Sequence, residues 1–510
     1  MGKLIFLSAF VVSCLLCSSQ DVLAISNKPV TTSQLKTQAQ YELRYRDIYF
    51  HYYRKDLFTS LSRLMAEMEM GRLPPRGEGH NLLLGALYTS YELRSDAEDI
   101  LSLVANSSGN RRHLDLAWFY LARLFFGENN YSKTSSALSS VRGQLPPNLL
   151  PEFQYIYLAL QLDKGNFEVA QRQLKKMEEE GVWHAYGQYN LGANLVKRGK
   201  TSQGLSFLDS VGELPLSSEE LGALRDKSNV TLGFYFLRRQ NDHAAIKYFQ
   251  RVRMTGQFSK KALLGLGWAY SQSGNYKTAL VPWIKLSRDN IYDSTVQEGI
   301  LAAAFALQKV AAQQQAMDNY NNAISIYQTI KTRINESMHD VRSGKISTAV
   351  LNGEQFDDIA ITQRLENVLS KDKGHLLRFL LQDEEFQYVF KQYRDVRYLY
   401  HKTQEWKSLT RRYGSMMPEQ KSVRNGQLSS LKTNGEIRFS TRDEIDDLKV
   451  RILSSEKRLK SLLADYELAL QKKMLEKLDQ QYVVVTNYLS QARYAVAELL
   501  DKPGSAGVLE

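Results

Sequence analysis

The sequence predicts an all-α protein, a helical-repeat array followed by long helices. Two segments in the middle of the chain repeat each other at a fixed period of 34 residues. The composition, with 43% hydrophobic residues, 24% charged residues and only 10 prolines, is typical of a folded helical chain. The stretch Thr441 to Asp501 contains neither glycine nor proline. At 510 residues the chain exceeds one ordinary core, so we expect several units or a solenoid.

The repeat is clearest between Asn229 and Leu286. Its matching positions, each 34 residues apart, are Leu232, Gly233, Phe236, Ala245, Phe249 and Val252 in the first copy and Leu266, Gly267, Tyr270, Ala279, Trp283 and Leu286 in the second. We expect Gly233 and Gly267 to lie where two helices cross too closely for a Cβ atom. Turns are predicted at 240–242 and 274–275.

This order of Leu-Gly, aromatic, Ala and aromatic positions resembles the tetratricopeptide repeat, a helix–turn–helix unit. Less regular copies extend it to about eight helical hairpins between Tyr41 and Ile330. The resemblance implies a right-handed α-solenoid that binds other proteins. The whole chain also resembles uncharacterised exported tetratricopeptide proteins of proteobacteria, which indicates an address more than a function.

The chain divides into six predicted segments. They are a signal peptide (1–24), an N-terminal lead (25–40), the repeat solenoid (41–341), a helical linker region with loops (342–440), a long helix or coiled coil (441–501) and a disordered tail (502–510).

The long C-terminal stretch carries a heptad seam. Its members are Leu478, Tyr482, Val485, Leu489, Ala492, Val496 and Leu499. A second seam upstream, beginning at Leu448, is out of phase with the first. The shift near 470–474 therefore indicates either a stutter in one helix or a bend between two helices. We expect this stretch to pack against a helix over 376–409 in a coiled bundle.

Residues 1–24 have the form of a secretory leader. Lys3 supplies the positive charge, an apolar run follows, and Ala24 ends a small-residue cleavage site. The run is too short to span a bilayer permanently. A second interpretation uses Cys14, which lies in a stretch resembling a bacterial lipoprotein box and would make the protein an outer-membrane lipoprotein. Either way we expect export, with the periplasm as the favoured compartment.

The formal net charge of +11 and the pI near 9.2 raise the question of a nucleic-acid partner. Export argues against it. A basic surface outside the cytoplasm suits anionic lipid, an acidic polysaccharide or an acidic partner protein. The alternative interpretation is a basic surface that is simply solvated.

No sequence pattern indicates catalysis. The chain has no nucleotide-binding glycine loop, no His-Glu-x-x-His and no Gly-x-Ser-x-Gly, and its eight histidines are scattered. Both cysteines, Cys14 and Cys17, lie in the leader, so cleavage after Ala24 leaves no thiol. We therefore predict no catalytic residues, no cofactor and no metal site, and a protein that is not an enzyme.

The resemblance does imply a partner-binding groove. In the tetratricopeptide family the first helix of each hairpin lines the concave face. The matching positions are Phe119, Arg123, Tyr189, Lys197, Val230, Phe234, Arg238, Leu264, Trp268 and Gln272. Rings beside cations suit an extended peptide with acidic groups. The alternative is that Phe234 and Trp268 simply pack between neighbouring repeats.

Together these features predict a non-enzymatic scaffold or adaptor of the bacterial cell envelope, serving an assembly, secretion or proteolysis complex. The alternative is a basic solenoid that holds an acidic polysaccharide or a peptidoglycan strand. Self-association through the C-terminal helices is compatible with either function.

Overall fold

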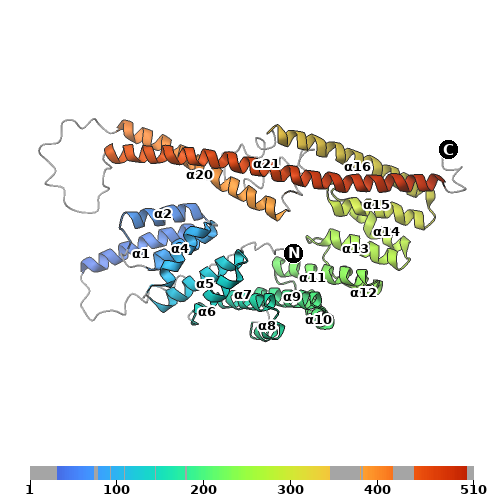
Figure 1. The fold of residues 1–510 in the computed structure, drawn as a ribbon, viewed down its shortest axis with the longest axis horizontal. Helices are drawn as coiled ribbons and strands as arrows, with labels where there is room; N and C mark the ends of the chain where they lie inside the picture. The colour runs from blue at the N-terminus through green and yellow to red at the C-terminus, as the bar shows by residue number, and fades with distance from the viewer. Residues whose placement is uncertain are drawn as a thin grey trace. The chain divides into compact units, whose positions relative to one another are not determined.

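The computed structural model describes residues 32–54, 56–73, 78–91, 93–107, 110–143, 145–177, 181–344, 380, 383–416 and 442–501. Over these ranges the secondary structure is entirely helical (Figure 1). The predicted leader, Cys14, the cleavage site and the tail lie outside the described residues. Among the described residues, no helix combines the length and the apolar character needed to cross a membrane.

In the described part of the chain, the first sixteen helices follow one another as eight pairs, which confirms the predicted hairpins. The first helices of the pairs are α1 (Thr32–Tyr53), α3 (Glu78–Ser90), α5 (Arg111–Gly127), α7 (Leu150–Asp163), α9 (Val182–Lys197), α11 (Glu219–Arg238), α13 (Ser259–Gln272) and α15 (Ser294–Lys309). The second helices are α2 (Leu57–Glu69), α4 (Arg94–Ala105), α6 (Tyr131–Ser140), α8 (Phe167–Leu174), α10 (Thr201–Gly212), α12 (Asp242–Gln250), α14 (Tyr276–Ser287) and α16 (Gln313–Arg342).

The helices group into two compact units. Unit 1 comprises residues up to 235 together with 250–258, and unit 2 comprises 236–249 together with residues from 259 onward. The division falls within the pair α11 and α12, inside the stretch where the sequence repeat is most regular.

Short polar signals begin several helices of unit 1. The side chains of Asp56, Asn110 and Asn130 accept hydrogen bonds from backbone N–H groups in the first turns of α2, α5 and α6. These bonds satisfy donors that a helix start otherwise leaves unpaired. Within the pairs, turns use left-handed backbone at Gly165 (φ +76°) and Gly199 (φ +85°), a conformation that costs glycine little. Local sequence therefore determines where these hairpins break.

In unit 2, close helix crossing explains the small residues of the repeat. A Cβ atom on Gly267 would overlap the Trp283 indole, which confirms the prediction for this glycine. Gly265, which the sequence analysis did not single out, meets the Phe249 ring in the same way. Ala245 and Ala279 are fully buried at the corresponding crossings. The turns lie where predicted, with left-handed backbone at 240 and 274.

Unit 2 ends in two long helices, α20 (Glu384–Met416) and α21 (Arg442–Asp501). The 60-residue α21 is one continuous helix, so the phase shift near 470–474 lies within one helix rather than at a bend (Figure 1). The helix packs against α20, as expected, and also against α15 and α16.

The heptad seam of α21 is buried within the chain itself. Gln481 Nε2 donates to Gln297 Oε1 of α15 at 3.3 Å, and the Tyr488 ring lies 6.0 Å from the Tyr327 ring of α16. The fully or nearly buried seam positions are Leu478, Val485, Leu489, Ala492 and Leu499. The hydrophobic seam that suggested self-association is thus covered by the last helices of the array.

Some predicted boundaries were wrong. Helix α1 begins at Thr32, inside the predicted lead 25–40, because Ser and Thr suit a helix start as well as a loop. Helix α20 extends to Met416, beyond the predicted end at 409, and passes through Gly414 in its last turn. The greater part of the predicted linker, including 345–379 and 417–440, lies outside the described residues.

Candidate functional site

The ten residues predicted to line a groove lie on the first helices α5, α9, α11 and α13. The structure leaves Lys197, Arg238 and Gln272 exposed and half-buries Arg123, Phe234 and Trp268. The remaining four are buried: Phe119, Tyr189, Val230 and Leu264. The prediction for Phe119 is wrong, because its ring is 0% exposed and belongs to the core of unit 1.

Arg123 faces a carboxylate of its own chain. Its Nε lies 3.0 Å from Glu152 Oε1 on α7, and the Glu152 side chain is only 11% exposed. Burial raises the pKa of Glu152, and the nearby Arg123 opposes that shift. This pair links two adjacent first helices, so Arg123 is committed to holding the repeats together.

Aromatic side chains gather on the first helices α5, α7 and α9 of unit 1. The Tyr155 ring centroid lies 5.2 Å from that of Trp183 and 6.3 Å from that of Tyr186. Phe126 meets Tyr155 edge-to-face at 6.4 Å. Trp183 and Tyr186 are half-buried, so they combine contact area with a fixed position. We call Phe126, Tyr155, Trp183 and Tyr186 the aromatic cluster.

Polar partners hold the aromatic cluster in place. Asn190 Nδ2 donates to the Tyr155 hydroxyl at 2.9 Å, and the Tyr186 hydroxyl donates to Glu220 Oε1 on α11 at 2.7 Å. Burial, followed by the Glu220 carboxylate, raises the pKa of Tyr186 well above its usual range. The repeat pattern did not indicate this cluster. One signal was present in the sequence: Tyr155, a member of the cluster, lies one repeat period before Tyr189, so a tyrosine recurs on successive first helices.

In unit 2, Trp268 faces a carboxylate and not an open groove. Its Nε1 donates to Glu298 Oε1 on α15 at 2.8 Å, and its ring packs edge-to-face on Trp283 at 5.1 Å. Burial, and then the negative charge of the same Glu298, raise the pKa of Tyr488 on α21. Trp268 thus packs between neighbouring repeats, the alternative that the sequence left open.

Gln272 also has partners within unit 2. In the amide orientation that satisfies both groups, its nitrogen donates to the Leu237 carbonyl at 3.0 Å and to Asp242 Oδ1 at 2.8 Å. Burial raises the pKa of Asp242. The exposed Gln272 therefore ties α13 to the end of α11 and the start of α12.

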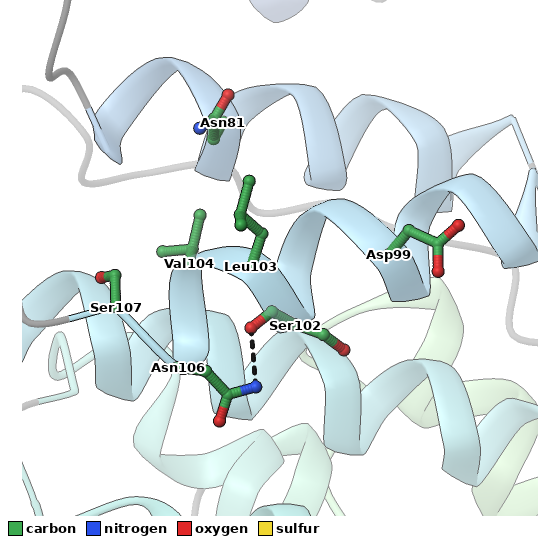
Figure 2. A pocket seen from close by; sticks show the side chains of 7 residues that line it. All are labelled: Asn81, Asp99, Ser102, Leu103, Val104, Asn106 and Ser107. Carbon is green, nitrogen blue, oxygen red and sulfur yellow. Dashed lines mark hydrogen bonds between the residues drawn. The ribbon is translucent and has the colours of Figure 1, made fainter.

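An open cavity of about 520 Å³ lies between α3 and α4 (Figure 2). Most of its lining residues are small or polar, although most of the lining surface is apolar: Asn81, Asp99, Ser102, Leu103, Val104, Asn106 and Ser107. Asn106 Nδ2 donates to the backbone carbonyl of Ser102 at 2.9 Å, so this amide also braces the end of α4. Asp99 is the one charged side chain of the lining, and it is exposed. The cavity offers hydrogen bonds to a polar solute but no pair of groups suited to acid–base chemistry.

The fully buried carboxylates of unit 1 have structural partners. Asp226 accepts from the backbone N–H of Arg253 at 3.0 Å and from its Nε at 2.7 Å. Asp115 accepts in the same way from the backbone N–H of Arg142 at 3.1 Å, and from the Arg111 guanidinium. Both carboxylates join a first helix to the residues that follow the second helix. Within the described ranges, no group of three or more His, Cys, Asp and Glu side chains could hold a metal ion.

No protein-family model matches the chain, and no curated protein matches it. Among solved structures, a tetratricopeptide repeat protein from Parabacteroides merdae is 15% identical, covers 48% of this chain and 92% of its own, and has a TM-score of 0.34. The C-terminal part of a TPR repeat-containing protein from Cytophaga hutchinsonii is 16% identical, with coverages of 50% and 95% and a TM-score of 0.30. The apo form of RapI is 12% identical, with coverages of 75% and 98% and a TM-score of 0.36.

At these identities and TM-scores, the likenesses decide nothing about what the chain binds. The assignment rests on the chain's own features. The sequence repeats at 34 residues, the helices pair, and glycine and alanine occupy the crossings where the repeat requires small residues. The chain is a tetratricopeptide-like helical-repeat protein.

Proposed function

We propose that the chain is a non-enzymatic scaffold of the bacterial cell envelope that binds protein partners on the first-helix face of unit 1. The observation that carries the proposal is the aromatic cluster. Trp183 is half-buried among the rings of the cluster, and the half-buried Tyr186 is held by its hydrogen bond to Glu220. Trp and Tyr side chains fixed in this way contribute most to protein interfaces, because little side-chain entropy is lost on binding. We therefore propose Trp183 and Tyr186, in place of Phe119, as partner-binding residues.

Two lysines on α9 and α11 suit an extended partner segment. The exposed Lys197 ends α9, about 20 Å along the helix from Trp183. Lys227 Nζ of α11 lies 5.1 Å from the ring centroid of Tyr189 on α9. Rings can take apolar side chains of such a segment while the two lysines attract its acidic groups. Arg238, an exposed predicted groove residue of unit 2, remains a second place for acidic contacts.

Alanine substitutions in the aromatic cluster test the proposal. Partners captured from an envelope extract by the tagged full chain would be identified by mass spectrometry, purified and titrated against Trp183→Ala by calorimetry. We expect roughly tenfold or greater loss of affinity, the scale of an interface hot spot. Tyr494→Ala on α21, which removes a ring that is 73% exposed, is the matched control and should bind normally. Equal affinity of wild type and Trp183→Ala, with both folded by circular dichroism, would refute the site.

The proposed location in the cell envelope depends on residues 1–24 acting as a secretory leader. N-terminal sequencing of the protein from the envelope fraction should give Ile25 as the first residue if Ala24 ends the signal peptide. Incorporation of labelled palmitate at Cys14 would instead support the outer-membrane lipoprotein.

The net charge of +11 also supports the second candidate, an acidic polysaccharide or peptidoglycan strand held by the basic solenoid. Salt-sensitive binding of purified polymer, in the absence of any protein partner, would favour this function over the scaffold.

A further inference from the structure

One end of the α20–α21 pair carries exposed aromatic and apolar side chains. Trp406 and Leu409 on α20 are 44% and 37% exposed, and Leu448 on α21 is 44% exposed. Nearby residues of the same two helices are buried: Thr410 on α20 and Ile452 on α21. A group of exposed large apolar side chains at one place indicates a surface that another body covers.

Two ion pairs set the register of the helices. Lys407 Nζ lies 2.6 Å from Glu456 Oε2, and Lys473 Nζ lies 2.6 Å from Glu385 Oε2. The helices are therefore antiparallel, and the stretch 406–409 lies beside 449–457.

Helical spacing places the exposed groups on one side of the pair. On α20, the buried Thr403 and Thr410 face α21, and Gln404 and Lys407 lie to one side, where both bond to Glu456. Trp406 and Leu409 come three residues apart on the opposite side of the buried positions.

On α21, one row of residues has spacings of three and four: Leu448, Arg451, Ser455, Arg458 and Leu462. The row lies on the other side of the buried Ile452 from Glu456, so it shares the side of Trp406 and Leu409. We call Trp406, Leu409, Leu448, Arg451 and Arg458 the hairpin-end face. A second row on α21, with Leu453, Lys457 and Lys460, lies on the side of Glu456.

The hairpin-end face is basic. Arg451 and Arg458 are exposed on this face, and none of its five residues is acidic. Residues 391–412 of α20, counted over all sides of the helix, contain seven Lys and Arg residues against two Asp and Glu residues. This charge disfavours the same face of a second copy, since two positive surfaces repel each other. It favours an anionic surface that also accepts apolar rings.

We propose that the hairpin-end face binds the surface of an anionic lipid bilayer. Tryptophan is enriched at the level of the lipid headgroups, where its ring is apolar and its N–H reaches a polar partner. Arg451 and Arg458 lie beside Trp406 and Leu409, so cations meet lipid phosphates while apolar side chains enter the boundary of the acyl chains.

Vesicle binding tests the proposal directly. The full chain is mixed with vesicles of phosphatidylglycerol and phosphatidylcholine in equal parts, or of phosphatidylcholine alone, and sedimented. We expect binding to the first only, weakening as salt is raised. Emission from tryptophan should shift to shorter wavelength on binding, and Trp406→Phe should remove that shift while retaining most of the binding. Absence of sedimentation with the phosphatidylglycerol vesicles overturns the proposal.

Paired variants test which side of the hairpin binds. Each Lys or Arg near an anionic bilayer strengthens binding by roughly fivefold, so Arg451→Gln with Arg458→Gln should weaken it by roughly 30-fold. Lys457→Gln with Lys460→Gln makes the same charge change on the other side of α21 and should cost clearly less. Leu409→Ser and Leu453→Ser form the corresponding apolar pair. Equal losses within either pair overturn the assignment.

An acidic protein partner is the competing occupant. Binding of polyglutamate by the wild type, lost in the Arg451→Gln, Arg458→Gln variant and without a Trp406 emission shift on vesicles, would replace the lipid proposal by that one.

Discussion

The indole N–H of Trp268 donates to the carboxylate of Glu298 across 2.8 Å, which joins α13 to the next first helix, α15. Burial, and then the charge of the same carboxylate, raise the pKa of Tyr488 on α21. One carboxylate thus accepts from the preceding first helix and acts electrostatically on the long C-terminal helix. This arrangement explains why a tryptophan in a predicted groove position is half-buried rather than open to a partner.

Removing the Glu298 carboxylate should destabilise unit 2. Glu298→Ala leaves the half-buried Trp268 Nε1 without its acceptor, and we expect a loss of about 1–3 kcal/mol in the free energy of unfolding. Urea denaturation followed by circular dichroism measures it. Glu336→Ala on α16 is the control: its carboxylate lies 3.2 Å from Arg333 at the surface and should be worth at most about 0.5 kcal/mol. Similar losses in the two variants would contradict a structural role for the Trp268–Glu298 hydrogen bond.

Tyr488 should make stability sensitive to alkaline pH. Burial, and then the Glu298 carboxylate, raise the pKa of Tyr488 from 10.0 to about 12. A group whose pKa is higher in the folded state stabilises fully below its unfolded pKa and loses that contribution as pH rises through the folded value. Stability should therefore fall between pH 10 and about 12, and fall less in Tyr488→Phe. Urea midpoints of both proteins across this range give the difference. Parallel curves would exclude Tyr488 as a cause.

The close crossing at Gly267 should not tolerate a methyl group. Gly267→Ala forces its Cβ into the buried Trp283 indole, and overpacking of this kind costs about 1–3 kcal/mol. Gly127→Ala in the last turn of α5 meets nothing within 4 Å and should be neutral or slightly stabilising, because alanine restricts the unfolded chain. Thermal unfolding of the two variants tests the contrast. A Gly267→Ala protein as stable as wild type would mean that the two helices separate easily.

Asp226 and Glu219 both bind Arg253, but they should contribute very differently to the free energy of unfolding. Asp226 is fully buried, and its removal leaves the Arg253 backbone N–H and guanidinium without this acceptor, so Asp226→Ala should cost about 3 kcal/mol. Glu219 also pairs with Arg253, at 2.9 Å, but its side chain is 81% exposed. Glu219→Ala should leave the urea midpoint nearly unchanged. A larger effect at Glu219 than at Asp226 would reverse this assignment.

Local sequence patterns were sufficient to locate the helices α11 to α14 and α21. The repeat positions from Leu232 to Leu286 located the pairs α11 to α14, because a hairpin breaks where a turn residue tolerates left-handed backbone and crosses where small residues recur. The absence of glycine and proline after Thr441 predicted α21. Boundaries were less certain: Thr32 starts a helix in a segment whose composition also suits a loop.

The candidate site was predicted less well, because a helix position does not specify exposure. Phe119 and Trp268 occupy predicted groove positions, yet one ring is in the core and the other meets Glu298. The rings of Tyr155, Trp183 and Tyr186 come together only when consecutive first helices pack side by side. A pattern that repeats along the chain cannot distinguish these outcomes.

The sequence by itself determined the helix content, the hairpin period, the glycine crossing at Gly267 and the seam of α21, because these depend on residues near one another or on a fixed spacing. Only the tertiary structure decided what the seam covers. Leu478, Val485 and Leu489 pack against α15 and α16 of the same chain, since the last repeat exposes an apolar side that no further repeat buries. Tertiary packing also placed the aromatic cluster and the hairpin-end face, where a partner and a bilayer surface are proposed to bind.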